Sequence, residues 1–185
     1  MILLRHGQSE FNVVFSATKR DPGITDPHLT ELGRAQIAAA AGQLAGEGVR
    51  RIVASPYTRA LQTAAIAAER LGVPVLIDVV VRERCAFACD IGTPRATLAE
   101  AWPHHDFAAL DEVWWPEGIE TEAEILARAA RFRAAMAEDP AWRETLVVSH
   151  WGFILALTGE KLQNGEWVRC DPTAPAPAEI DWLHP

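Results

Sequence analysis

The first nine residues read Met1-Ile2-Leu3-Leu4-Arg5-His6-Gly7-Gln8-Ser9, an apolar run that ends in charged and polar side chains. Consecutive apolar residues are typical of a short strand that is buried on both faces, as in a parallel sheet covered by helices. Ligands of such sheets bind beyond the carboxyl ends of the strands. Arg5 and His6 are therefore the first candidate site residues.

Strand and helix patterns alternate along the rest of the chain. Thr30 is a candidate helix cap, and apolar residues follow it at helical spacing from Ile37 to Leu44. The alternation predicts an α/β fold, a three-layer α/β/α sandwich with a mainly parallel central sheet. Further strands are expected at 51–55, 75–81, 145–149 and, at the sheet edge, 179–183; further helices at 61–71, 125–136 and 151–162; irregular structure at 85–120; and a surface loop at 171–178.

The composition is that of a globular protein, with 49% apolar and 23% charged residues among 185. We expect a single domain over residues 1–185, in which residues 85–120 cover the site and decide specificity. The net charge of −8 argues against nucleic acid or an anionic membrane as a partner. No apolar run is long enough to span a bilayer, and no signal-peptide pattern is visible. Three cysteines, an odd number, favour reduced thiols and a cytoplasmic location. The oligomeric state stays open.

Each predicted parallel strand is followed by side chains that suit phosphate chemistry. Arginine binds phosphate oxygens through its planar fork, and a histidine among positive charges stays neutral and nucleophilic. A carboxylate at the same rim can protonate a leaving oxygen. Together these groups suit transfer of a phosphoryl group to histidine, with no metal required. The residues after the strands are Arg5 and His6, then Arg59, then Arg82 and Glu83, and then His150.

Four ordered segments resemble the histidine phosphatase superfamily, also called phosphoglycerate mutase-like, and the resemblance covers about residues 1–157. The segments are Leu4-Arg5-His6-Gly7-Gln8-Ser9-Glu10-Phe11-Asn12, Leu29-Thr30-Glu31-Leu32-Gly33-Arg34-Ala35-Gln36, Ser55-Pro56-Tyr57-Thr58-Arg59-Ala60-Leu61-Gln62-Thr63-Ala64 and Val147-Val148-Ser149-His150-Trp151-Gly152.

The resemblance implies that His6 is the nucleophile and becomes phosphohistidine. It also implies that Arg5, Arg59 and His150 hold the transferred group and that Glu83 is the proton donor. The other substrate-binding candidates are Gly7, Gln8, Ser9, Asn12 and Trp151.

The expected function is metal-independent hydrolysis of a phosphomonoester, a small phosphorylated metabolite, with no cofactor. A mutase is less favoured, because the chain is short and Glu83 precedes Arg84-Cys85-Ala86-Phe87 instead of a tyrosine–glycine segment. Phosphoglycerate mutase-type transfer and a catalytically silent phosphate-binding module remain alternatives.

Several residues have a structural alternative. Glu83 could pair with a flanking arginine, and Gln8 and Ser9 could cap a turn. Trp114 and Trp115 could form either a lid over the site or an apolar plug beneath it.

Overall fold

The centre of the structure, a computed structural model that describes residues 1–183, is a five-stranded sheet. The three pairings among β1, β2, β3 and β4 are parallel, while β5 pairs antiparallel with β1. The predicted, mainly parallel sheet is confirmed. The strand order is β3 (Val75–Ile77), β2 (Arg51–Ala54), β4 (Thr145–Ser149), β1 (Ile2–Arg5) and β5 (Trp167–Arg169).

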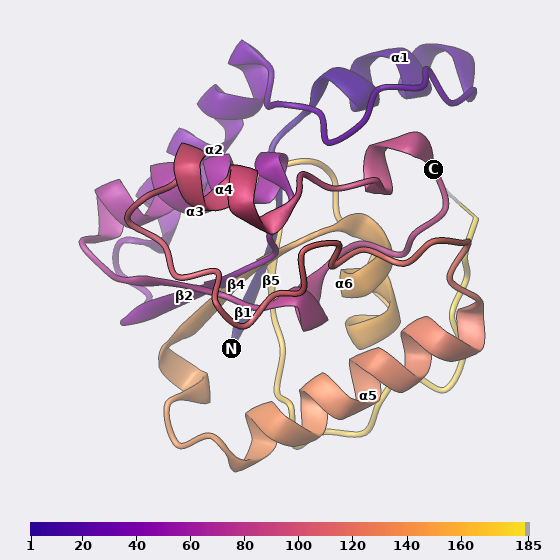
Figure 1. Cartoon of the computed structure of the whole chain (residues 1–185). Helices are drawn as coiled ribbons and strands as arrows, with labels where there is room; N and C mark the ends of the chain where they lie inside the picture. Colours follow the sequence, from indigo (N-terminus) through magenta and orange to yellow (C-terminus); the bar gives the residue numbers. More distant parts are fainter. Residues whose placement is uncertain (184–185) are drawn as a thin grey trace.

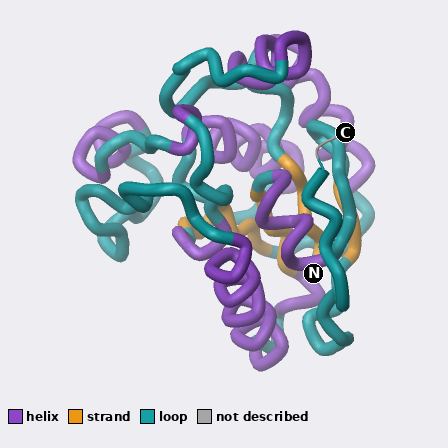
Figure 2. The backbone as a smooth tube through the Cα atoms, turned by 90° about the vertical axis from the view of Figure 1, so that its right-hand side faces the viewer, coloured by secondary structure: helices purple, strands orange, loops and turns teal. Residues whose placement is uncertain are grey.

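Helices cover both faces of this sheet (Figures 1 and 2). Because successive side chains of a strand point to opposite faces, Ile2 and Leu4 enter one apolar core and Leu3 enters the other. The first core is formed with α2 (Glu31–Leu44) and α3 (Thr58–Leu71), and the second with α5 (Glu122–Glu138) and α6 (Trp151–Thr158).

The helix boundaries follow local capping chemistry. The hydroxyl of Thr30 accepts a hydrogen bond from the Gly33 amide, so α2 begins where the sequence predicted. Gly72 ends α3 with φ of 68°, a conformation that glycine adopts readily. Gly159, with φ of 78°, ends α6 at Thr158, so the helix expected to reach residue 162 is shorter.

Of the predicted strands, the one at 75–81 is shorter than expected and the one at 179–183 is absent. The strand expected over 75–81 stops at Ile77, because the Asp78 side chain accepts from the Val80 amide and starts the 3-10 helix η1 (Val79–Val81). Residues 179–183 form no strand. They follow a loop in which Pro172, Pro175 and Pro177 have no amide hydrogen to donate, and β5, which the sequence analysis missed, occupies the sheet edge instead.

The segment expected to be irregular, 85–120, contains η2 (Ala88–Asp90) and α4 (Arg95–Ala101). Seven residues are too few to show helical periodicity clearly, yet Leu98 of α4 is buried. Helix α1 (Glu10–Thr18), also missed, begins at Ser9 with a reciprocal capping box to Asn12. The remaining element is η3 (Trp142–Glu144).

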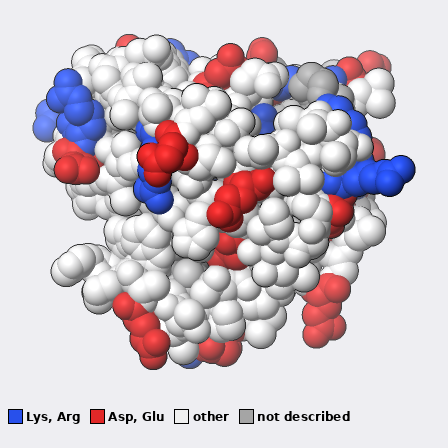
Figure 3. All heavy atoms as spheres, turned by 90° about the horizontal axis from the view of Figure 1, so that it is seen from above, with Lys and Arg blue, Asp and Glu red and all other residues white. Residues whose placement is uncertain are grey.

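The molecular surface carries small, separate groups of acidic and basic side chains on the face seen from above in Figure 3. Within residues 1–183, no helix is long and apolar enough to cross a membrane.

Candidate active site

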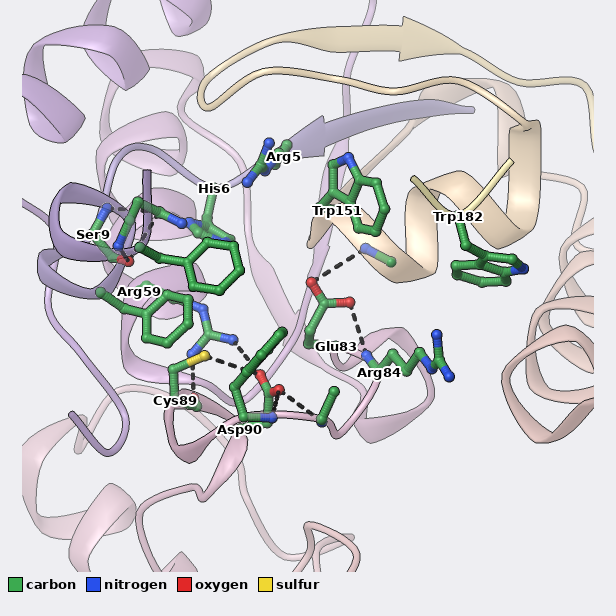
Figure 4. Close-up of a pocket in the computed structure, with 16 residues that line it drawn as sticks. Arg5, His6, Ser9, Arg59, Glu83, Arg84, Cys89, Asp90, Trp151 and Trp182 are labelled. Atoms are coloured by element: carbon green, nitrogen blue, oxygen red, sulfur yellow. Dashed lines mark hydrogen bonds and ion pairs between the residues drawn. The ribbon is translucent and has the colours of Figure 1, made fainter. Parts of the chain in front are cut away.

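A cavity of about 270 Å³ lies among the loops that follow β1 and η1 and the starts of α1, α3 and α6 (Figure 4). The structure thus brings together side chains that lie far apart in the sequence. The predicted site residues that line it are Arg5, His6, Ser9, Asn12, Arg59, Glu83 and Trp151.

His6 is fixed by main-chain contacts and its ring carries a defined proton. Its amide donates to the Ser149 carbonyl at the end of β4. Its Nδ1 lies 2.7 Å from the carbonyl oxygen of Gly7, and since a carbonyl only accepts, Nδ1 holds the hydrogen. Burial, and then the charges of Arg59 and Arg5, hold the pKa of His6 well below its usual value. The ring is therefore neutral at pH 7, with a lone pair on Nε2.

Two buried arginines supply positive charge to the cavity. Burial lowers the pKa of Arg5 to about 10, so the side chain stays charged at neutral pH. Its Nη1 donates to the Leu162 carbonyl at 2.6 Å. Arg59 donates to the Cys89 carbonyl at 2.7 Å and to the Asp90 carboxylate at 3.1 Å. Burial alone would lower the pKa of Arg59, but Cys89 and Asp90 outweigh it, and the pKa is raised.

His150 adjoins His6 without itself lining the cavity. The two ring centroids lie 5.1 Å apart, and the Nε2 of His150 is 2.8 Å from the Ser55 hydroxyl. Burial and Arg59 hold the pKa of His150 well below its usual value. Among residues 1–183, the Nδ1 of His150 and the Nε of Arg5 are buried without a hydrogen-bond partner. An anion in the site would supply the missing acceptor for Arg5.

Glu83 faces the cavity from the loop after η1, and its carboxylate accepts from three backbone amides, those of Arg84, Gly152 and Phe153. The last two belong to the first turn of α6, where a helix favours a negative charge. Burial and the nearby carboxylate of Asp90 nevertheless raise the pKa of Glu83. Such a group can hold a proton at a pH where an exposed glutamate would not.

The arginines that flank Glu83 make other contacts. The side chain of Arg82 pairs with Glu120 at 3.0 Å, and that of Arg84 donates to the Glu120 carbonyl. In the structure, Arg82 therefore forms its ion pair with Glu120, and not with Glu83 as the structural alternative supposed.

Comparisons with known proteins agree with this geometry. The sequence model of the histidine phosphatase superfamily (branch 1) matches residues 1–180. The chain belongs to this superfamily. Its relatives include the glucosyl-3-phosphoglycerate phosphatase of Mycobacterium tuberculosis, with 33% identity over 90% of this chain and 78% of that protein. A solved structure of mycobacterial glucosyl-3-phosphoglycerate phosphatase with VO3 superposes with a TM-score of 0.61, at 31% identity over 95% of this chain and 85% of that one.

A mutase is also among the relatives, although the match is partial. The 2,3-bisphosphoglycerate-dependent phosphoglycerate mutase of a Methylobacterium species is 40% identical over 45% of this chain and 41% of that protein. The predicted fold and the prediction of a histidine phosphatase-type hydrolase are confirmed at the level of the family.

Two predicted substrate-binding residues lie outside the lining of the cavity. Gly7 packs against α2, where an added Cβ would lie 2.4 Å from the Gly33 carbonyl oxygen. Gln8 accepts from the Thr30 hydroxyl at 2.9 Å and so contacts the start of the same helix. Gly7 and Gln8 therefore hold the loop after β1 against α2.

Several residues of the cavity escaped the sequence analysis. Asp90, 1% exposed, pairs with Arg59 and accepts from the amides of Ala86 and Phe87. In the sequence, only its place in the segment 85–120 pointed to a role for Asp90 in the site. Trp114 does not line the cavity; it is buried against Tyr57 in a separate apolar cluster. The other lining residues not predicted are Phe11, Phe15, Arg84, Ala86, Phe87, Cys89, Gly152 and Trp182.

A second missed feature lies behind Glu83. Arg128 of α5 is 5% exposed and donates to the carbonyls of Val80 and Arg82 at 2.8 Å each and of Glu83 at 3.3 Å. Its guanidinium also pairs with Glu120 at 2.5 Å. Arg128 therefore fixes the backbone of the loop that carries Glu83.

Proposed function

We propose that this chain hydrolyses phosphomonoesters through a covalent phosphohistidine on His6. The observation that carries the proposal is the neutral His6 ring, with its proton on Nδ1, between the buried guanidinium groups of Arg5 and Arg59. Positive charge fixed in advance stabilises the negative charge that spreads over a phosphoryl group during transfer.

The reaction has two steps. In the first, the Nε2 of His6 attacks phosphorus, the bond from phosphorus to the ester oxygen breaks, and Glu83 gives its proton to the departing alcohol. In the second, water attacks phosphorus, the bond from phosphorus to Nε2 breaks, and Glu83 takes the proton of the water. In this proposal Arg5 and Arg59 hold the phosphoryl oxygens in both steps, and His150, which adjoins His6 just outside the cavity lining, adds a third contact once the phosphoryl group is bound. The raised pKa of Glu83 suits a group that alternates between acid and base.

The substrate in this proposal is a small phosphorylated metabolite, and no cofactor or metal takes part. The volume of about 270 Å³ suits such a molecule, and the names of the mycobacterial relatives state that they act on one. Residues 85–120 act as the covering segment of a single domain, since Ala86, Phe87, Cys89 and Asp90 line the cavity. The three cysteines are free and buried, which supports a reducing compartment such as the cytoplasm.

The test is hydrolysis of p-nitrophenyl phosphate in the presence of EDTA. Wild type and a control, His104→Asn at an exposed position, should release nitrophenol equally, and His6→Asn should not. Asparagine keeps a donor for the Gly7 carbonyl but offers no nucleophilic nitrogen. Turnover by His6→Asn near the wild-type rate would overturn the assignment. Interconversion of 2- and 3-phosphoglycerate by wild type, without net release of phosphate, would show the mutase reaction instead.

A further inference from the structure

The cavity has two ends of different chemistry. Arg5, His6 and Arg59 form the charged end, where the proposed function places the phosphoryl group. Five aromatic side chains stand among the other residues of the lining. They are Phe11, Phe15, Phe87, Trp151 and Trp182.

Three of these rings make a continuous aromatic wall. The ring centroid of Phe15 lies 5.2 Å from that of Phe11 and 5.1 Å from that of Phe87, and Phe11 and Phe87 are 5.7 Å apart. Two of the rings come from α1 and the third from the segment 85–120. Such contacts hold the rings in fixed relative orientation, so the wall presents a defined apolar surface.

Trp182 brings the C-terminal segment to the cavity. Figure 4 shows it with Trp151 on the α6 side of the site, across from Ser9 and Arg59. The Arg84 guanidinium lies 5.1 Å from the centre of the Trp182 ring, a cation–π contact. Lys161 pairs with the Asp181 carboxylate at 2.7 Å and donates to the Leu183 carbonyl at 2.8 Å. The residues on both sides of Trp182, Asp181 and Leu183, are thus bound to Lys161.

The acceptor oxygens of the polar side chains near the aromatic end already have partners inside the protein. The Oδ1 of Asn12 accepts from the Ser9 amide at 3.0 Å and from the Asn164 amide group at 3.2 Å. Asp90 is held by Arg59 and two backbone amides, and Glu83 by three. The many hydroxyls of a sugar or polyol would lose water here and find few free acceptors for their hydrogens, which disfavours binding.

We propose, on the basis of the function proposed above, that the alcohol released by this enzyme carries an aromatic ring. The ring lies between the wall of Phe11, Phe15 and Phe87 and the indoles of Trp151 and Trp182. The volume agrees, since an apolar protein cavity of roughly 150 Å³ accommodates benzene, and this one measures about 270 Å³ and also holds the phosphoryl group.

The test compares 2-phenylethyl phosphate with propyl phosphate and glycerol 3-phosphate, three alkyl esters whose leaving oxygens have similar basicity. For wild type, kcat/KM for the phenylethyl ester should exceed that for each of the others by about tenfold or more, the discrimination typical of one well-filled apolar pocket. Equal or better hydrolysis of glycerol 3-phosphate would overturn the inference and leave the proposed function standing. Failure to hydrolyse any ester would contradict the proposed function itself.

Variants locate the preference. Phe87 is 42% exposed, so Phe87→Ala should fold, and the ratio of phenylethyl to propyl ester should fall several-fold. Trp182→Ala should lower the same ratio. Ile91→Ala is the matched control, because Ile91 is 44% exposed in the same segment and lies outside the cavity lining. A ratio that stays at the wild-type value in both aromatic variants would overturn the inference.

Discussion

The Nδ1 of His6 and the carbonyl oxygen of Gly7 lie 2.7 Å apart, so the ring is tied to the backbone of the residue that follows it. The contact determines both the tautomer and the direction of the ring. It leaves Nε2, and not Nδ1, with the lone pair that attacks phosphorus.

This contact predicts where the phosphoryl group is found. Wild type mixed rapidly with substrate and stopped in alkali should carry phosphate on Nε2 of His6. Phosphorus NMR of the denatured protein distinguishes the two ring isomers. A phosphoryl group on Nδ1, or on another residue, would contradict the proposed geometry.

The two buried histidines make stability depend on pH. Burial, and then Arg59, hold the folded-state pKa of both rings well below the usual 6.5. The unfolded chain therefore takes up protons first as the pH falls, and the stability that the neutral rings contribute is complete above about pH 6.5 and is lost below it. In that range, each ring should lower the free energy of unfolding by about 1.4 kcal/mol for every pH unit of acidification.

Urea unfolding of wild type and His6→Asn at pH 7.5 and 5.5 measures this effect. Wild type should lose more free energy of unfolding between the two pH values than the variant does, while the exposed His104→Asn should follow wild type. An equal loss in wild type and His6→Asn would show that the ring is not held neutral by the fold.

Glu83→Gln should affect esters according to their leaving groups. With the acid removed, kcat/KM, which reports transfer to His6 and not the later attack of water, should fall by about 10²–10⁴-fold for alkyl phosphates and far less for nitrophenyl phosphate. The decline of wild-type activity with rising pH, as Glu83 loses its proton, should disappear. Glu117→Gln, at an exposed position, is the control. Equal losses for both kinds of ester would assign the proton donor elsewhere.

Arg59 and Asp90 are 3% and 1% exposed, so neither charge can turn to solvent. Arg59→Met should lower kcat by about 10²–10³-fold and the free energy of unfolding by about 3–5 kcal/mol, because it leaves a buried carboxylate unpaired. Adding Asp90→Asn should restore much of the stability and none of the activity. Thermal unfolding and kcat/KM separate the two effects, and recovery of activity in the double variant would refute the role of Arg59.

Arg128→Lys tests whether α5 positions the loop of Glu83. A lysine cannot reach three carbonyls and a carboxylate together, so kcat should fall by roughly 10–100-fold, as with other residues that orient a reacting group. KM should change little, and the alkaline limb of the pH profile should shift. Arg131→Lys, exposed on the same helix, is the control. A change in stability alone would mean that Arg128 serves only the fold.

The sequence predicts the parts of this protein that repeat or that follow strands. Alternating apolar runs indicate the sheet and its main helices, and Arg5, His6, Arg59 and Glu83 come together because the strand ends meet at one rim. Short elements such as α4 and β5 contain too few residues to show a period. Asp90 reaches Arg59, and Phe87 reaches Phe11 and Phe15, only through the path of the segment 85–120, which no local pattern determines. The contacts of Arg128 with the loop of Glu83 likewise depend on how α5 packs.

Gly7 and Gly33 approach so closely that a Cβ on either would meet backbone, at 2.4 Å from Gly33 for the first and 2.1 Å from Gln8 for the second. The loop that carries His6 thus rests on α2 through main-chain atoms that no side-chain substitution can reshape. For an engineer, the loop of His6 is therefore the part of the site that tolerates no redesign. New substrate preferences can be introduced at Phe87, Trp151 and Trp182 without moving the reacting nitrogen of His6.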